Sequence, residues 1–193
     1  MTLPHPSLER RVRAGKITRT LARLFPDVGI ALRYGNPWEL YVAVVLSAQC
    51  TDKKVNEITA TLFEKYPTLS DYRRAPFEEF ADDIRSSGFY RAKAKNILAA
   101  AHIVAERYNG KLPCSMAELL KLPGVARKTA NVILGEACGI VEGIAVDTHV
   151  KRFVQKFDLS DSRDPVKVFA NRMLDELRAA VILTGNLVEF FEQ

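Results

Sequence analysis

The chain has 193 residues, enough for one large or two small domains, and 48% of them are hydrophobic, which is ample for a buried core. No apolar run approaches the length that crosses a bilayer, and the first residues lack the apolar segment of a signal peptide. The sequence therefore predicts a soluble, cytoplasmic protein with no membrane partner.

The formal net charge of +5 is unevenly placed. Residues 1–24 hold six basic side chains against Glu9 alone, which accounts for the whole excess. Further basic islands occur at Arg91, Lys93 and Lys95, at Lys121, Arg127 and Lys128, and at Lys151, Arg152 and Lys156. Such separation is typical of a protein that turns one face to a polyanion, although a single island is more often a solvated helix face.

The pattern of the first half predicts consecutive helices. The first spans about 7–24 and ends before Pro26. Asn36 as N-cap, Pro37 at the first helical position and Glu39 at the third open the second helix, whose apolar residues predict burial. A third helix is expected over 52–65, and short helices over 68–74 and 77–86.

The second half continues in the same way. A long helix is expected over 91–108, closed by Asn109-Gly110. Residues 115–121 open with a Ser-x-x-Glu capping box, and Asp147 is the expected N-cap of a helix that reaches about Phe157. The last helix is expected from Asp164 toward Leu183. Because no strand-like alternation occurs, we predict an all-α fold.

A helix, a four-residue hairpin and a second helix are predicted around Pro123-Gly124, a turn signal that directly precedes an apolar-periodic run. Unpaired N–H groups at the start of the second helix, together with the helix dipole, favour an anion such as a DNA phosphate. Lys128 is expected in the first turn beside Arg127. There the dipole, the guanidinium and partial burial disfavour the ammonium form, which makes a lysine nucleophilic.

The segment Leu122-Pro-Gly-Val-Ala-Arg-Lys128-Thr-Ala-Asn-Val, followed by Val146-Asp147-Thr-His149, resembles the helix-hairpin-helix and Gly/Pro-Asp signature of the endonuclease III family of DNA glycosylases with AP lyase activity. A lone hairpin turn of this kind is weak evidence, because many non-enzymatic DNA-binding proteins contain one. A lysine and an aspartate at this spacing are much more specific.

The resemblance implies two helical domains with a catalytic cleft between them. Residues 31–141 would form a six-helix barrel with the helix-hairpin-helix, and residues 1–30 with 142–193 a terminal helical domain without an iron–sulfur loop. It also implies a base-excision-repair N-glycosylase with β-elimination activity on oxidised pyrimidines and abasic sites. Lys128 would attack C1′ of the everted nucleotide, and Asp147 would assist its deprotonation. Simple N-capping is the commoner role of such an aspartate.

The same resemblance implies the DNA contacts. Gln49, in Leu46-Ser-Ala-Gln49-Cys-Thr-Asp52, would fill the gap left by the everted nucleotide, and Phe89 would be the apolar wedge, where leucine is commoner. The alternatives are a polar residue ending a buried helix and a loop aromatic packed on the core. Further contacts are expected from Arg91, Leu122, Gly124, Ala126, Arg127, Thr129 and His149.

His149 would touch phosphate or hold Asp147, or else be a capping or core histidine. Ala126 stands where many family members have a second glycine. If that position required positive φ, alanine would cost on the order of 1 kcal/mol.

The expected partner is double-stranded DNA with damaged bases or abasic sites, bound by a monomer at the nucleoid. The alternative is a non-catalytic or truncated helix-hairpin-helix DNA-binding protein. The family usually has cysteines that ligate an iron–sulfur cluster, and their absence after Cys138, together with the apolar stretch over 179–193, favours this alternative. The presence of both Lys128 and Asp147 argues against it.

The three cysteines, Cys50, Cys114 and Cys138, show no C-x-x-C pairing and suggest reduced structural thiols. The family usually carries four cysteines near its C-terminus that ligate a [4Fe–4S] cluster, and no cysteine follows Cys138. We therefore expect no cluster and no other metal site, although hairpin carbonyls in related proteins can hold a monovalent cation. A cluster-less member and a shortened version of a longer chain both stay open.

Overall fold

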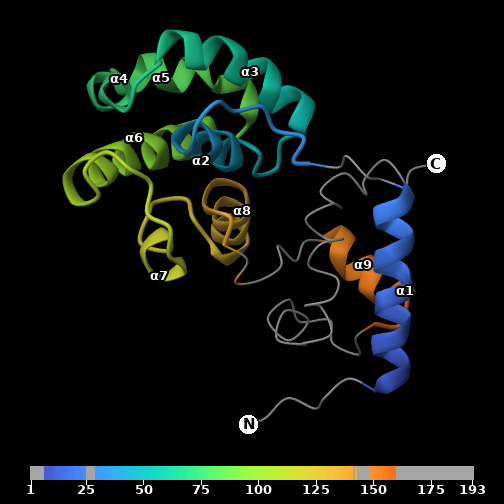
Figure 1. Ribbon diagram of the computed structural model, residues 1–193. Coiled ribbons are helices and arrows are strands. Elements are labelled where there is room, and N and C mark those ends of the chain that lie inside the picture. Colours follow the sequence, from blue (N-terminus) through green and yellow to red (C-terminus); the bar gives the residue numbers. More distant parts are fainter. Residues whose placement is uncertain (1–6, 25–28, 141, 143–147, 160–193) are drawn as a thin grey trace. The chain divides into compact units, whose positions relative to one another are not determined.

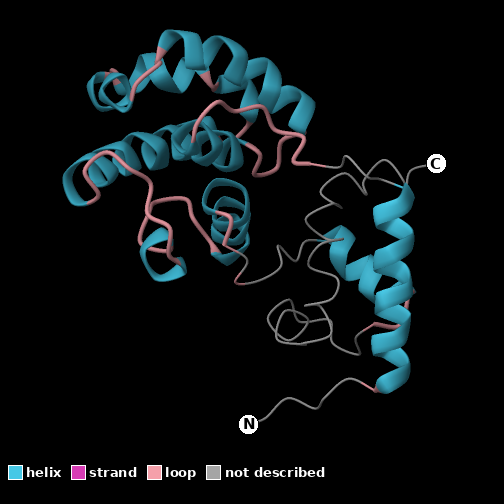
Figure 2. Ribbon diagram, viewed as in Figure 1, coloured by secondary structure: helices cyan, strands magenta, loops and turns pink. Residues whose placement is uncertain are grey.

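The computed structural model describes residues 7–24, 29–140, 142 and 148–159, which form helices and loops (Figures 1 and 2). The prediction of an all-α fold is confirmed for this part of the chain. The elements are α1 (Leu8–Leu24), α2 (Pro37–Leu46), α3 (Asp52–Lys65), α4 (Leu69–Arg74), α5 (Phe77–Asp83), the 3₁₀ turn η1 (Arg85–Ser87), α6 (Tyr90–Arg107), α7 (Met116–Leu119), α8 (Arg127–Cys138) and α9 (Thr148–Lys156).

The chain divides into two compact units, residues 1–31 with 141–193 and residues 32–140. The assignment of 31–141 to a six-helix barrel and of 1–30 with 142–193 to a terminal domain stays a prediction. The helix expected from Asp164 toward Leu183 lies outside the described residues. Among the described helices, none combines the length and apolar character that a membrane span needs.

The helix starts of the second unit follow their sequence signals. The Asn36 side chain accepts the N–H of Glu39 at 3.0 Å, and the Glu39 carboxylate accepts the N–H of Gly35 at 2.6 Å. Thr51 caps α3 by accepting the N–H of Lys54 at 3.3 Å. At the end of α6, Gly110 adopts a positive φ of 76°, as expected of a terminating glycine.

Helix α2 is the centre of the unit 32–140. Its residues Leu40–Leu46 are all buried, as the uninterrupted apolar run predicts. It packs against α3, α6 and α8, while α6 also packs against α4 and α5 (Figure 1). Burying each large apolar side chain contributes roughly 1.5–3 kcal/mol, so α2 is a rigid base for the segments attached to it.

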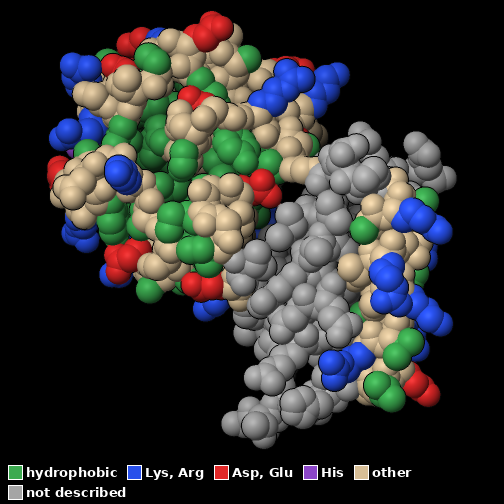
Figure 3. All heavy atoms as spheres, in the orientation of Figure 1, with side chains coloured by type: hydrophobic (Ala, Val, Ile, Leu, Met, Phe, Trp, Pro, Cys, Tyr) green, Lys and Arg blue, Asp and Glu red, His purple; other side chains and the backbone are tan. Residues whose placement is uncertain are grey.

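In the unit that contains α1 and α9, ion pairs join α1 to a residue that follows α9. Arg10 and Arg13 form ion pairs with Asp158 at 2.8 and 2.7 Å, and the Arg13 and Arg10 guanidinium groups lower the pKa of that carboxyl group. Phe153 and Val154 of α9 are buried. The other basic side chains of α1 lie along an exposed helix surface (Figure 3).

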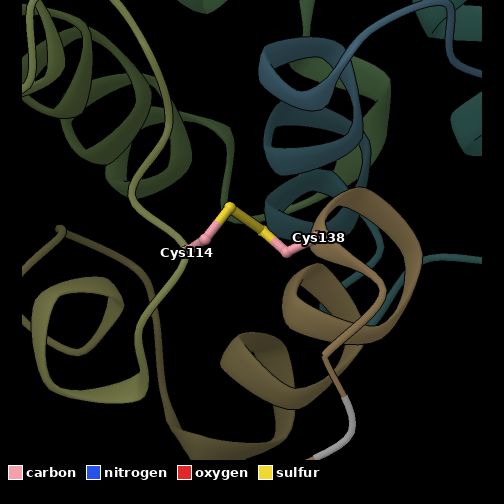
Figure 4. Close-up of a disulfide and its surroundings, with 2 residues drawn as sticks. All are labelled: Cys114 and Cys138. Atoms are coloured by element: carbon pink, nitrogen blue, oxygen red, sulfur yellow. A yellow bond between two sulfur atoms is a disulfide. The ribbon is translucent and has the colours of Figure 1, made fainter.

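A disulfide joins Cys114 to Cys138, so the prediction of three reduced thiols is wrong (Figure 4). The two cysteines are 24 positions apart in sequence, but their Cα atoms lie 5.8 Å apart. The hairpin between α7 and α8 turns the chain back, which brings the end of α8 beside the loop before α7. Only Cys50 is a free cysteine in the described residues.

The disulfide gives a first prediction. Replacing Cys138 by serine should lower the free energy of unfolding by about 3 kcal/mol, because the unfolded chain has more conformational entropy when the disulfide does not close its loop. Urea denaturation without reductant measures the difference in free energy of unfolding between the variant and the parent protein. This difference should vanish when dithiothreitol reduces the parent protein. Cys50→Ser is the control, because it leaves the disulfide intact. Three titratable thiols in the unreduced, denatured parent protein would contradict the disulfide.

Candidate functional site

The segment Leu122-Pro123-Gly124-Val125 forms a tight turn, closed by the N–H of Val125 donating to the carbonyl of Leu122 at 3.2 Å. Proline at the second position and glycine with a positive φ of 79° at the third are the residues that a type II turn requires. A β-carbon on Gly124 would lie 3.3 Å from the side chain of Asn96 and 3.5 Å from Val45. The turn is therefore packed closely against α6 and α2.

The turn is also held by a buried hydroxyl group. Tyr41 of α2 donates to the carbonyl of Pro123 at 2.6 Å, and burial raises the pKa of Tyr41, so the phenol stays protonated as a donor. Its ring stacks on Trp38 at 5.0 Å between centroids. The hairpin thus stands on the most buried helix of the unit.

The first helix of the hairpin is shorter than predicted. Helix α7 ends at Leu119, and Lys121 and Leu122 continue in i to i+3 turns by donating to Glu118 and Leu119 at 3.1 and 3.0 Å. Ser115 caps α7 by accepting the N–H of Glu118 at 3.3 Å. The Glu118 carboxylate bonds to Tyr108 and Lys121 among its contacts in the structure.

Helix α8 begins at Arg127, as predicted, and its N-cap is Ala126. Alanine offers no capping oxygen, and Ala126 makes no side-chain cap hydrogen bond. Ala126 has φ −98° and ψ 172°, an ordinary extended conformation. The strain considered for alanine at this position is therefore absent, because Gly124 supplies the positive φ of the hairpin.

Lys128 lies in the first turn of α8 and its side chain is exposed, so the predicted partial burial is wrong for the described structure. The carboxylate of Asp52, at the start of α3, interacts with it electrostatically. Burial raises the pKa of Asp52, while the positive charge of Lys128 lowers it. Sequence reasoning quoted Asp52 within its motif but gave it no role, because only folding brings the starts of α3 and α8 into electrostatic range.

The other hairpin positions differ in how exposed they are to a ligand. Gly124, Ala126 and Arg127 are exposed and Thr129 is half-buried, so all four are accessible to a ligand. Leu122 is buried, and its N–H donates to Leu119. The Leu122 side chain therefore anchors the turn in the core, and the expected DNA contact at this residue stays a prediction.

Arg91 was predicted to contact DNA, but its guanidinium group is engaged within the protein. It donates to both carboxylate oxygens of Glu78 at 2.8 and 2.7 Å and lies 5.1 Å from the centre of the Phe77 ring. Glu78 is one of the acidic residues near this basic island. Since this bidentate pair offsets the positive charge, Arg91 is a weaker candidate for a phosphate contact than its sequence position indicates.

Gln49 and Phe89 share an unusual backbone conformation. Their φ angles are 54° and 46°, in the left-handed region, where a residue other than glycine costs on the order of 1 kcal/mol or more. The two other such residues in the described chain, Asn109 and Asp158, are of types that tolerate this region. Both Gln49 and Phe89 are exposed, and Phe89 is 70% exposed. Phe89 is therefore not packed on the core of its unit.

Lys93 does not belong to an exposed basic island. Its side chain is only 5% exposed, and its ammonium group donates to the carbonyls of Leu46 and Ser87, each at 2.7 Å. Burial lowers the pKa of Lys93, while Cys50 acts in the opposite direction. Sequence reasoning missed this because a lysine inside a helix normally extends its charge into solvent.

Asp147 lies outside the described residues, and so does the side chain of His149, although His149 belongs to α9. No cluster of three potential ligands among histidine, cysteine, aspartate and glutamate occurs in the described residues. The cysteines do not fit the family's iron–sulfur cluster, because two form a disulfide and none follows Cys138 in the 193 residues.

Comparison with known proteins identifies the protein family. Residues 42–178 match the family model of the HhH-GPD superfamily base excision DNA repair proteins. The chain is 45% identical over 159 residues to "Endonuclease III" of Synechocystis sp., covering 82% of this chain and 73% of the relative. It is 50% identical over 143 residues to "Endonuclease III" of Bacillus subtilis, covering 74% and 65%. The chain thus spans about two thirds to three quarters of these relatives' length.

Among solved structures, the chain is similar to the protein of "Structure of a non-covalent Endonuclease III-DNA Complex", with TM-score 0.83 and 41% identity over 92% of this chain and 84% of that one. The chain belongs to the HhH-GPD superfamily of base excision DNA repair proteins. The prediction of a DNA glycosylase and lyase of the endonuclease III type is supported by the same matches, and the non-catalytic alternative is not favoured.

The packing of Gly124 gives a second prediction. Gly124→Ala should lower the free energy of unfolding by more than Gly110→Ala. Both glycines have nearly the same positive φ, 79° and 76°, and each change costs about 1–2 kcal/mol of backbone strain. Only at Gly124 does the new methyl group meet a side chain at 3.3 Å. Urea denaturation measures both, and equal destabilisation would show that the turn is loosely packed.

Proposed function

We propose that this protein removes oxidised pyrimidines from double-stranded DNA and cleaves the strand at the resulting abasic site, with Lys128 as nucleophile. The observation that carries the proposal is the exposed side chain of Lys128 in the first turn of the helix that follows a tightly packed hairpin. Family membership supports the same reaction class.

DNA would dock through its phosphates at the hairpin. The start of α8 presents the positive end of the helix dipole, beside the exposed side chain of Arg127. The type II turn and the Tyr41 hydrogen bond fix where this helix begins. Docking at this position would bring the sugar of a nearby nucleotide within reach of Lys128. The carbonyls of the same hairpin are the proposed ligands of a monovalent cation.

In the proposed reaction the neutral amine of Lys128 attacks C1′ of the everted nucleotide. The C–N bond to the base breaks, and the base leaves with the electron pair and accepts a proton. The nitrogen lone pair then forms a C=N bond with C1′ as the C1′–O4′ bond breaks and O4′ takes up a proton, which opens the sugar and gives a protonated Schiff base. Loss of a proton from C2′ allows the C3′–O bond to break, which is β-elimination, and water finally releases the enzyme amine.

A carboxylate must help to deprotonate Lys128 and stabilise the charge that develops on the sugar. The sequence motif assigns this role to Asp147. The electrostatic interaction with Asp52 supports a second carboxylate near this amine. Gln49 would replace the everted nucleotide in the duplex and Phe89 would wedge between base pairs, which accords with their exposure.

Borohydride trapping tests the proposal. Duplex DNA with an abasic site or thymine glycol, incubated with the protein and borohydride, should give a covalent adduct that Lys128→Ala abolishes. Lys111→Ala is the matched control, because Lys111 is exposed in the same unit but follows the far end of α6, and it should leave the adduct unchanged. Salt-sensitive binding without an adduct would instead favour a non-catalytic DNA-binding protein.

The cysteine pattern gives a further prediction about cofactors. The purified chain should contain no stoichiometric iron and should lack the brown colour of an iron–sulfur protein, because only Cys50 remains as a free thiol in the described residues. Metal analysis and visible absorbance measure this. Iron at several atoms per chain would show that the cluster assignment is wrong.

A further inference from the structure

We propose that Lys93 is a positioning residue that holds the two DNA-reading segments, around Gln49 and around Phe89, in one fixed arrangement. The inference rests on the proposed function, because it takes Gln49 and Phe89 as the residues that enter the duplex. Lys93 itself touches no DNA, since its side chain is buried.

The ammonium group joins two segments that are distant in sequence. Its bond to the Leu46 carbonyl, at 2.7 Å, holds the end of α2 three residues before Gln49. Its bond to the Ser87 carbonyl, also 2.7 Å, holds η1 two residues before Phe89. The backbone N–H of Lys93 also donates to the Phe89 carbonyl at 3.1 Å. One residue therefore fixes both segments.

The two segments need such a contact because both contain backbone strain. Gln49 and Phe89 are in the left-handed region, and a residue of this kind keeps that conformation only when its surroundings hold it there. The segment around Gln49 is further tied by the N–H of Cys50 donating to the Ser47 carbonyl at 3.1 Å. The segment around Phe89 is tied by the backbone N–H of Ser87, which donates to the Ile84 carbonyl at 2.9 Å. The ammonium group links these two local turns.

Simple core packing does not account for a lysine at this position. A buried amine is costly to desolvate, and methionine would fill similar space without that cost. An ammonium group, however, can donate to several carbonyls at once, and it does so here where the carbonyls of two segments converge. The residue type therefore fits a link between main-chain segments better than it fits a filler of the core.

A base-filling residue and a wedge act on the same duplex at the same time, so their spacing must suit one DNA geometry. With Lys93 present, both enter as a preformed pair. Without it, each segment moves by itself, and everting the nucleotide has to order both. The chemistry at Lys128 is on a different helix and does not require the link.

Hydrogen exchange on the DNA-free protein tests the link directly. Lys93→Met should raise amide exchange at least tenfold in both 46–51 and 85–90, with the rest of the unit 32–140 unchanged. Lys111→Met, the same chemical change at an exposed position beyond α6, should alter neither segment. An increase in one segment only, an increase throughout the unit, or no increase would each overturn the proposal.

Nucleotide eversion tests the consequence for DNA. A duplex with 2-aminopurine opposite a tetrahydrofuran abasic analogue should become more fluorescent as the protein unstacks the probe. Lys93→Met should lower the equilibrium constant of this step at least tenfold in the parent protein. In the Gln49→Ala/Phe89→Ala background it should change the constant less than twofold, because the residues that Lys93 positions are absent. An equal loss in both backgrounds would overturn the positioning role.

The two proposals fail separately. The tetrahydrofuran analogue cannot form a Schiff base, so the fluorescence signal does not depend on Lys128 as nucleophile. If trapping with borohydride fails while the Lys93-dependent signal is seen, the lyase assignment is wrong and the positioning role stands. If trapping succeeds but Lys93→Met leaves exchange and fluorescence unchanged, the positioning role is wrong and the lyase stands.

Discussion

The unit 32–140 depends on the close packing of one turn against one buried helix. A β-carbon on Gly124 would lie 3.3 Å from the Asn96 side chain, which is a tight contact, and Tyr41 of α2 holds the carbonyl of the preceding proline. These contacts fix where α8 begins. Because Lys128 follows in the first turn of that helix, the packing of the turn sets where its side chain begins.

The hairpin and the segments before Gln49 and Phe89 are held in the same way: a donor side chain bonds to their main-chain carbonyls. Tyr41 holds the hairpin in this way, and Lys93 holds the end of α2 and the segment before Phe89. Each donor lies on a helix with an extensive buried face, so its hydrogen bonds attach the loops to the packed core. Loops that bind ligands gain precision when a rigid scaffold orders them beforehand.

Much of this organisation could be predicted from the sequence. The start of α2 follows from Asn36-Pro37, because capping residues act on backbone groups only a few positions away. The type II turn follows from Pro123-Gly124 for the same reason. The cysteines and Lys93 were misjudged, since their roles depend on residues brought together by packing between segments far apart along the chain.

The sequence by itself determined the helical class, most helix boundaries and the family, because these depend on local capping, hydrophobic period and a motif of adjacent residues. Only the tertiary structure decided which polar side chains are buried, which cysteines pair and which carboxylate interacts with Lys128. Those outcomes depend on distances between separate helices, and a hydrogen bond, a disulfide or a charge interaction forms only when folding brings its two partners within a few ångströms.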